Sequence, residues 1–249
     1  MGADGATSLW TFEIEGPGYP GGYYTPAEEW VRAEHAARWL ALALFLLGCA
    51  ALGVGLPKED AVHALTTGAV GVMTLDALQS LGIAELRLKW PNDILAAAPA
   101  RAPESGDASP TLGKLGGILI ETVASSDGSR TAVIGVGLNL RSVPAAKLPP
   151  GALQPVCLDD LTTAKFERDA LLETLLVHYD IGLARFAQDG FAAFRDAWWR
   201  ARAYGDAPLT AKLPDGSELQ GRMADVTTRG ALVLASDWGL HTLVSGEVS

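Results

Sequence analysis

The stretch that decides the fold is KWPNDIL, residues 89–95, together with the run 83–89 that leads into it. In that run Leu86 and Leu88 alternate with charged residues, which is the period of two that is typical of a β-strand. Lys89 ends the run and falls on the face opposite to the two leucines. The Pro-Asn-Asp that follows favours a turn. The sequence therefore predicts a strand that ends in a turn, with the side chain of Lys89 on the side away from the leucines.

A helix and two further strands are predicted around this stretch. Residues 65–81 carry apolar side chains at helical spacing, and Gly82 follows as a C-terminal stop. Residues 117–123 and 131–138 are rich in β-branched and other apolar side chains, and a turn-like Ser-Ser-Asp-Gly segment lies between them. We expect these two strands to form an antiparallel pair.

The segment KLGGILIE, residues 114–121, opens a strand with Gly116 and Gly117. Adjacent glycines at such a place are typical of a bulge or a tight turn. They are equally typical of a backbone that a ligand approaches with no Cβ in the way. Taken alone, the segment leaves both interpretations open.

The segment VIGVGLN, residues 133–139, places Gly135 and Gly137 on one face of a strand and ends at Asn139. Alternate glycines leave a groove on that face. The Asn139 side chain offers both a hydrogen-bond donor and an acceptor at the end of the strand. By itself this pattern is only weak evidence for a ligand-binding site.

Two helices followed by short strands are predicted in the C-terminal part of the chain. Thr162 or Thr163 can cap a helix whose apolar stripe runs from Leu172 to Phe186, and a second helix follows at residues 191–202. Beyond Gly205, short strands are separated by turn-like sequences, which indicates a small β-barrel.

Composition limits the class of protein. The chain has 249 residues, 49% hydrophobic and 19% charged, as expected for one large or two modest globular domains. Its 19 Lys and Arg against 29 Asp and Glu give a net charge of −10, the wrong sign for a nucleic-acid partner. Cys49 and Cys157 lie in no zinc-ligand spacing and cannot frame a disulfide scaffold. We therefore expect a cytoplasmic protein without a metal site built on cysteine.

Residues 39–56 form an apolar run without any charge. A run of about 18 apolar residues is the lower limit for a transmembrane helix. Gly48, Gly53 and Gly55 would weaken a helix there. We interpret the run as a buried core element and expect no membrane partner, with a membrane-spanning helix as the alternative.

Taken together and in this order, KWPNDIL, KLGGILIE and VIGVGLN resemble the catalytic domain of the biotin protein ligases. The segments GALVL, residues 230–234, and SGEVS, residues 245–249, are similar to the small C-terminal domain of that family. The resemblance covers residues 65–249. It implies an α/β (α+β) fold in which helices flank a mixed β-sheet, as in class II synthetases and biotin ligases, followed by an SH3-like barrel.

The resemblance also implies domain boundaries and partners. Residues 1–204 would form the biotin/lipoate ligase-like catalytic domain, with 1–29 irregular and 96–113 a flexible insertion, and residues 205–249 would form the barrel. The acceptor would be a protein of the biotin carboxyl carrier type, and a homodimer is left open.

The implied reaction is the ATP-dependent formation of biotinyl-5'-AMP, followed by transfer to a lysine of the acceptor. Lys89 would be the catalytic cation that contacts biotin and the adenylate, since a fixed ammonium stabilises two repelling anions. Gly116 and Gly117 would line the biotin pocket. The predicted nucleotide-binding residues are Asn92, Asp93, Gly135, Gly137 and Asn139, with Mg²⁺ as a further cofactor beside ATP and biotin.

One family feature is missing from the sequence. Biotin protein ligases carry a loop rich in arginine and glycine that folds over the adenylate, and residues 15–39 hold only Arg32 and Arg38 as cations. Arginine clamps phosphate in a bidentate manner, so its loss weakens the case for adenylation. Two alternatives therefore stay open: a non-catalytic homologue that binds biotin or adenylate, and a ligase for another carboxylic acid such as lipoate.

Overall fold

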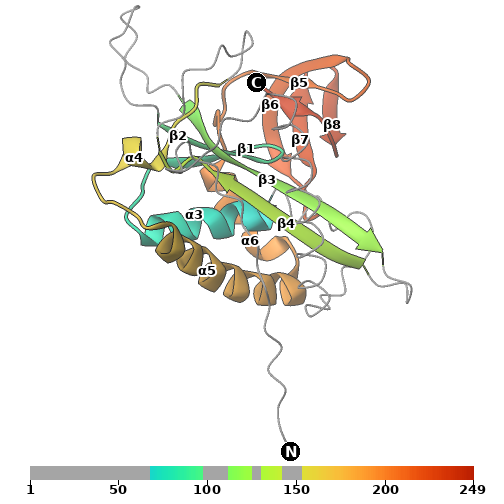
Figure 1. Cartoon of the computed structure of the whole chain (residues 1–249). Coiled ribbons are helices and arrows are strands. Elements are labelled where there is room, and N and C mark those ends of the chain that lie inside the picture. Colours follow the sequence, from blue (N-terminus) through green and yellow to red (C-terminus); the bar gives the residue numbers. More distant parts are fainter. Residues whose placement is uncertain (1–67, 98–111, 125–129, 142–152) are drawn as a thin grey trace, which may run out of the picture.

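The computed structural model describes residues 68–97, 112–124, 130–141 and 153–249 of the chain. Two antiparallel sheets and a layer of helices make up this part (Figure 1). The expectations for residues 1–29, for the apolar run 39–56 and for Cys49 lie outside the described residues. Among the helices that are described, none has the length and apolar character needed to cross a bilayer.

The first sheet has four strands in the order β1-β2-β3-β4. They are β1 (Leu86–Lys89), β2 (Asp93–Ala97), β3 (Leu112–Ala124) and β4 (Arg130–Leu138). Each strand is antiparallel to the next, which confirms the predicted strand before the Pro-Asn-Asp turn and the predicted antiparallel pair. Among the described residues, parallel pairing is limited to two isolated bridges, between Leu88 and Arg202 and between Lys114 and Pro155.

The insertion predicted at residues 96–113 is shorter than expected at both ends. Ala96 pairs with Gly113 and Ala97 pairs with Leu112, so β2 and β3 extend into it. Small alanines and a glycine suited a loop by composition, but cross-strand hydrogen bonding holds them in the sheet. Residues 98–111 lie outside the described part of the chain.

A layer of helices covers one face of the first sheet (Figure 1). It contains α3 (Gly71–Ser80), α5 (Arg168–Asp189) and α6 (Ala192–Ala201). A Cβ built on Gly71 would lie 3.0 Å from Leu88 Cδ2 and 3.7 Å from Ile118 Cδ1, so α3 packs against the leucine face of β1. This confirms the helix predicted before the strand and the apolar side assigned to that strand.

Helix α5 packs against α3 on the side away from the sheet. A Cβ on Gly182 would lie 2.5 Å from Met73 Cγ, so the absence of a side chain permits the close approach. The hydroxyl groups of Thr74 and Tyr179 form a buried hydrogen bond of 2.7 Å between the two helices. The predicted stripe of α5 is confirmed, since most of its members, Tyr179 and Phe186 among them, are buried.

The start predicted for this helix at Thr162 or Thr163 is wrong. A short helix, α4 (Leu158–Leu161), precedes it, and Thr162 is the C-cap residue of α4. Cys157 and Asp160 form the reciprocal hydrogen bonds that cap α4, so the capping signal belongs to a different turn of helix. α5 begins at Arg168, after Glu167.

The second sheet has five strands in the order β8-β7-β6-β5-β9. They are β5 (Leu209–Lys212), β6 (Glu218–Val226), β7 (Leu232–Ser236), β8 (Gly239–Leu243) and β9 (Glu247–Val248). The short strands after Gly205 are thus confirmed. Strands β8 and β9 lie at opposite edges of the sheet, and closure into an SH3-like barrel stays a prediction.

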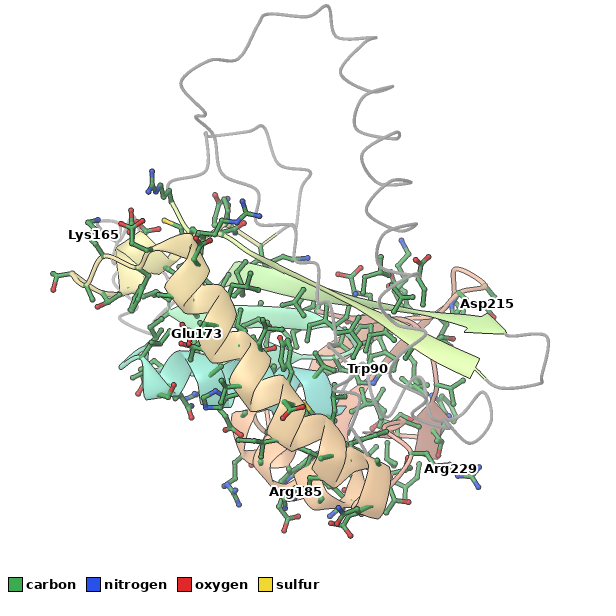
Figure 2. The ribbon with its side chains drawn as sticks, turned by 60° about the horizontal axis from the view of Figure 1, so that its bottom comes forward. Trp90, Lys165, Glu173, Arg185, Asp215 and Arg229 are labelled. Atoms are coloured by element: carbon green, nitrogen blue, oxygen red, sulfur yellow. The ribbon has the colours of Figure 1, made fainter. Side chains whose placement is uncertain are left out.

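Contacts of Trp90 and Arg195 join the first sheet and α6 to the second sheet. Trp90 is 1% exposed, and its indole N–H donates to the carbonyl oxygen of Gly230 at 3.4 Å. Figure 2 shows Trp90 inside the molecule, whereas the labelled Lys165 and Arg185 project outward. The guanidinium group of Arg195 on α6 contacts the carboxylate of Asp225 and the carbonyl oxygen of Val226 on β6. The second sheet is therefore fixed against the turn that follows β1.

Candidate functional site

The register of the first sheet aligns the three sequence motifs in one row. Lys89 pairs with Asp93, Asp93 with Gly117, and Gly117 with Gly137. Directly opposed residues of paired strands point to the same face of a sheet. Since Leu88 and Ile118 face α3, this row lies on the face without helices.

Part of that face is open in the described structure. Leu119, which pairs with Gly135, is 62% exposed. A Cβ on Gly137 would meet no described atom within 4 Å, and one on Gly117 would lie 3.7 Å from both Asp93 Oδ1 and Lys114 Nζ. The glycines therefore leave bare backbone beside two charged side chains.

Lys89 lies on this face as predicted, but its ammonium group is enclosed. Its side chain is 5% exposed. Its Nζ atom donates to Glu247 Oε1 on β9 at 2.8 Å and lies 3.6 Å from Asp93 Oδ2. The proposed catalytic cation is therefore neutralised by a carboxylate from the second sheet.

The charges of this group reinforce one another. Burial opposes the charged form of Lys89, but the hydrogen bond and charge of Glu247, followed by the charge of Asp93, outweigh it and raise the pKa of Lys89. The hydrogen bond and charge of Lys89 lower the pKa of Glu247. Tyr204 also interacts electrostatically with the cluster formed by Lys89, Asp93, Lys114 and Glu247. Burial raises the pKa of Tyr204, and the charge of Lys89 opposes this effect. Lys89 is thus an ammonium and Glu247 a carboxylate at neutral pH.

Lys114 belongs to the KLGGILIE segment, and no role was predicted for it from the sequence. Its Nζ atom lies 2.7 Å from Asp93 Oδ1, and its side chain is 47% exposed. The register between β2 and β3 shifts at Ile94 and Leu95, which brings Lys114 opposite Leu95 on the face away from the helices. A lysine two residues before paired glycines, within the KLGGILIE segment that carries part of the resemblance, was the signal that could have identified it.

Gly116 and Gly117 lie on opposite faces of β3. A Cβ on Gly116 would lie 2.2 Å from the carbonyl oxygen of Gly137 and 2.8 Å from Leu138 Cδ2. Gly116 is thus required for the close approach of β4, whereas Gly117 faces Asp93 and Lys114. The predicted role of Gly116 in biotin binding is not tested by this arrangement.

Asn92 and Asn139 have structural hydrogen bonds. The side-chain amide of Asn92 donates to the carbonyl oxygen of Ile118 at 3.1 Å. The side-chain amide of Asn139 donates to the carbonyl oxygens of Lys114 and Val156, both at 3.1 Å. These bonds fix the ends of β2 and β4 against β3 and leave the side-chain oxygens as acceptors.

The described residues do not fit a magnesium site held by the protein. Among them no group of three or more His, Cys, Asp or Glu residues is arranged to hold a metal ion. The two oxygens of Asp93 each face an ammonium group. Mg²⁺ as a companion of ATP therefore stays a prediction.

Cys157 is 2% exposed and therefore belongs to the core. Burial, followed by its hydrogen bond to Asp160, raises the pKa of its thiol to about 11. It is therefore a capping residue in its protonated form.

Comparison with known proteins identifies the relatives of this chain. No family model matches. The chain is 28% identical over 198 residues to the biotin--[acetyl-CoA-carboxylase] ligase of Paracoccus denitrificans, covering 77% of this chain and 75% of that protein. It is 30% identical over 185 residues to the protein of the same name from Mycobacterium tuberculosis, covering 72% of this chain and 60% of that protein. The bifunctional ligase/repressor BirA of Salmonella typhimurium is 26% identical, and the chain spans 51% of its length.

Solved structures share the fold. Apo biotin protein ligase from Aquifex aeolicus has a TM-score of 0.59 at 19% identity, covering 77% of this chain and 76% of that one. The complex of the same enzyme with biotin and ATP has a TM-score of 0.57 at 19% identity, covering 77% and 72%. A biotin protein ligase-like protein of unknown function from Silicibacter has a TM-score of 0.54 at 14% identity, covering 94% of both chains. In sequence the chain is similar to biotin protein ligases, and in fold it matches their solved structures.

Proposed function

We propose that the chain catalyses the ATP-dependent formation of biotinyl-5'-AMP and the transfer of the biotinyl group to a lysine of a carboxyl carrier domain. The names of the relatives support this proposal, as does the Aquifex structure that contains biotin and ATP. We further propose that the chain acts in the cytoplasm. Whether the chain forms a homodimer is left open.

The proposed reaction has two steps. The carboxylate oxygen of biotin attacks the α-phosphorus of ATP, and the bond to the pyrophosphate oxygen breaks, which releases pyrophosphate. The amine of the acceptor lysine then attacks the acyl carbon, the bond to AMP breaks, and the amine loses a proton as the amide forms. Both steps develop negative charge on oxygen, so a fixed cation accelerates them.

The observation that carries the proposal is the position of Lys114. Its half-exposed ammonium group lies beside the backbone of Gly117, which has no Cβ to keep an incoming carboxylate or phosphate away. In this proposal Lys114 contacts the two anions. Lys89, which the sequence favoured for that contact, is enclosed, and its assignment to biotin and adenylate depends on movement of Glu247.

The remaining site residues follow the sequence prediction. Gly116 and Gly117 would border biotin through their backbone. The nucleotide would lie along Gly135, Gly137, Asn92, Asp93 and Asn139, with the side-chain oxygens of the two asparagines as acceptors.

The cluster itself favours a second candidate, a homologue that binds biotin or an adenylate without turnover. Two ammonium groups, Lys89 and Lys114, face two carboxylates, Asp93 and Glu247, so the group has no net positive charge. An anion gains less from such a neutral group than from an unpaired cation. The sequence also lacks the arginine-rich loop of the family.

The test is exchange of labelled pyrophosphate into ATP in the presence of biotin, with lipoate and octanoate as alternative acids. We expect exchange with biotin and its loss in Lys114→Ala. Lys165→Ala removes an exposed lysine that pairs with Asp159 outside the cluster, and it should leave the exchange unchanged. Tight biotin binding by calorimetry without exchange would favour the non-catalytic homologue. Exchange with lipoate or octanoate alone would identify a ligase for another acid.

A further inference from the structure

We infer that Glu247 is a positioning residue for Lys114 and acts through Lys89 and Asp93. This inference rests on the proposed function, in which Lys114 contacts the reacting anions. It assigns a role to β9, the last strand of the second sheet. Glu247 on β9 is 158 residues from Lys89 in the chain.

The four groups form a row of alternating charge. Glu247 Oε1 lies 2.8 Å from Lys89 Nζ, Lys89 Nζ lies 3.6 Å from Asp93 Oδ2, and Asp93 Oδ1 lies 2.7 Å from Lys114 Nζ. Exposure is least in the middle, 5% for Lys89 and 13% for Asp93, and greatest at the ends, 66% for Glu247 and 47% for Lys114. The two inner groups therefore transmit a change at one exposed end to the other.

The backbone of the second sheet fixes the position of Glu247. Strand β9 is hydrogen bonded to β5 through Val248 and Glu247, which pair with Ala211 and Lys212. Gly246 has a φ of +132°, and a Cβ there would lie 2.6 Å from the carbonyl oxygen of Lys212. The tight turn at Gly246 thus brings the carboxylate of Glu247 over the end of β1.

Loss of the Glu247 charge would leave the Lys89 ammonium buried beside Asp93, the other carboxylate within ion-pair distance among the described residues. A buried charge that loses its partner is unfavourable, so it is attracted more strongly to the opposite charge that remains nearby. Lys89 would then approach Asp93 and compete with Lys114 for it. Lys114, released from its 2.7 Å contact, would lose its fixed position beside Gly117.

The kinetic test compares Glu247→Gln with Glu218→Gln, which removes the same charge from an exposed position on β6 of the same sheet. We expect Glu247→Gln to lower kcat of pyrophosphate exchange about 10- to 100-fold, as misplacement of a reacting group by about 1 Å does, with little change in KM for biotin. Glu247→Asp keeps the carboxylate and should recover most of the loss. Equal kcat in the two glutamine variants would overturn the inference.

A second test does not depend on activity. The ammonium signal of Lys114 in ¹⁵N-resolved NMR spectra, assigned with Lys114→Arg, should shift in Glu247→Gln and stay in place in Glu218→Gln. The double variant Lys89→Met with Glu247→Gln removes the competitor for Asp93, so the Lys114 signal should return close to its wild-type position. An unmoved signal in Glu247→Gln, or equal displacement in the single and double variants, would refute the role of Glu247. If the wild-type protein shows no exchange, the proposed function fails, and this measurement still decides whether Glu247 positions Lys114.

Discussion

Lys89→Met and Glu247→Gln each remove one charge of the same 2.8 Å ion pair, yet we predict unequal effects on stability. Lys89→Met removes the buried charge itself. The carboxylate of Glu247, already 66% exposed, returns to water, and Asp93 keeps its 2.7 Å contact with Lys114. Replacing a buried ion by an apolar side chain of similar length is often neutral or better. We therefore expect a loss in the free energy of unfolding below about 1 kcal/mol.

Glu247→Gln leaves the Lys89 charge in place and replaces its carboxylate partner with a neutral amide, whose oxygen is the weaker acceptor. The Lys89 side chain is 5% exposed, so water cannot replace the carboxylate without opening the contact between the sheets. The nearest described carboxylate, Asp93 at 3.6 Å, already binds Lys114. Leaving a buried ammonium without an opposite charge at hydrogen-bond distance costs about 1–3 kcal/mol, and we expect a loss in that range.

Urea unfolding followed by tryptophan fluorescence measures both losses, provided that the m-value stays constant. Glu218→Gln is the control for the loss of a negative charge, with an expected change within about 0.5 kcal/mol. A larger loss for Lys89→Met than for Glu247→Gln would refute the reasoning, because it would mean that Lys89 stabilises the fold as a charge. Equal stability of Glu247→Gln and the wild type would refute the assignment of the ion pair.

Gly116→Ala should cost more than about 2 kcal/mol in urea unfolding, because its Cβ would lie 2.2 Å from a carbonyl oxygen of β4. Gly137→Ala, with no described atom within 4 Å of its Cβ, should fold normally and weaken ATP binding in calorimetry. A larger loss of stability in Gly137→Ala than in Gly116→Ala would contradict the faces assigned to the two glycines. The lowered pKa of Glu247 means that its contribution to stability is present above its ordinary pKa of 4.5 and disappears as pH falls through the folded value. Acid unfolding curves of the wild type and Glu247→Gln should therefore converge below that pH, and parallel curves would contradict the pair. Tyr179→Phe removes the hydroxyl that bonds Thr74 between the helices and should cost about 1 kcal/mol, while a loss near zero would show that the bond is not important.

Strands β1, β3 and β4 were predictable because they depend on local periodicity, whereas β2 was not predicted. The alternation of leucines with charged residues placed Lys89 on the side away from α3, and the glycines of β3 and β4 marked the strands that complete the row. The order of the three motifs also pointed to the family. Each strand signal lies within a short stretch of sequence, so tertiary contacts had little opportunity to override it.

The partner of Lys89 was not predictable in this way. Glu247 lies 158 residues away, and the segment SGEVS showed only a resemblance to a C-terminal domain, not which strand it would approach. The role of Lys114 depends on a register shift in β2 and β3 that leaves no periodic signal. The capping signal at Thr162 failed because a four-residue helix precedes it, too short to show periodicity.

Lys89 and Lys114 differ in how exposed their side chains are, not in the face of the sheet on which they lie. Both lie on the face without helices and both contact Asp93, so strand alternation assigns them the same role. Lys89 is covered by the second sheet, and its charge is neutralised there by Glu247, whereas Lys114 keeps 47% of its side chain accessible. An incoming carboxylate or phosphate can reach Lys114 without displacing a protein carboxylate from a buried ammonium, and that displacement is the costly step at Lys89. The electrostatics of the first sheet therefore depend on the second sheet, which places Glu247 among the residues that decide whether the site can bind an anion.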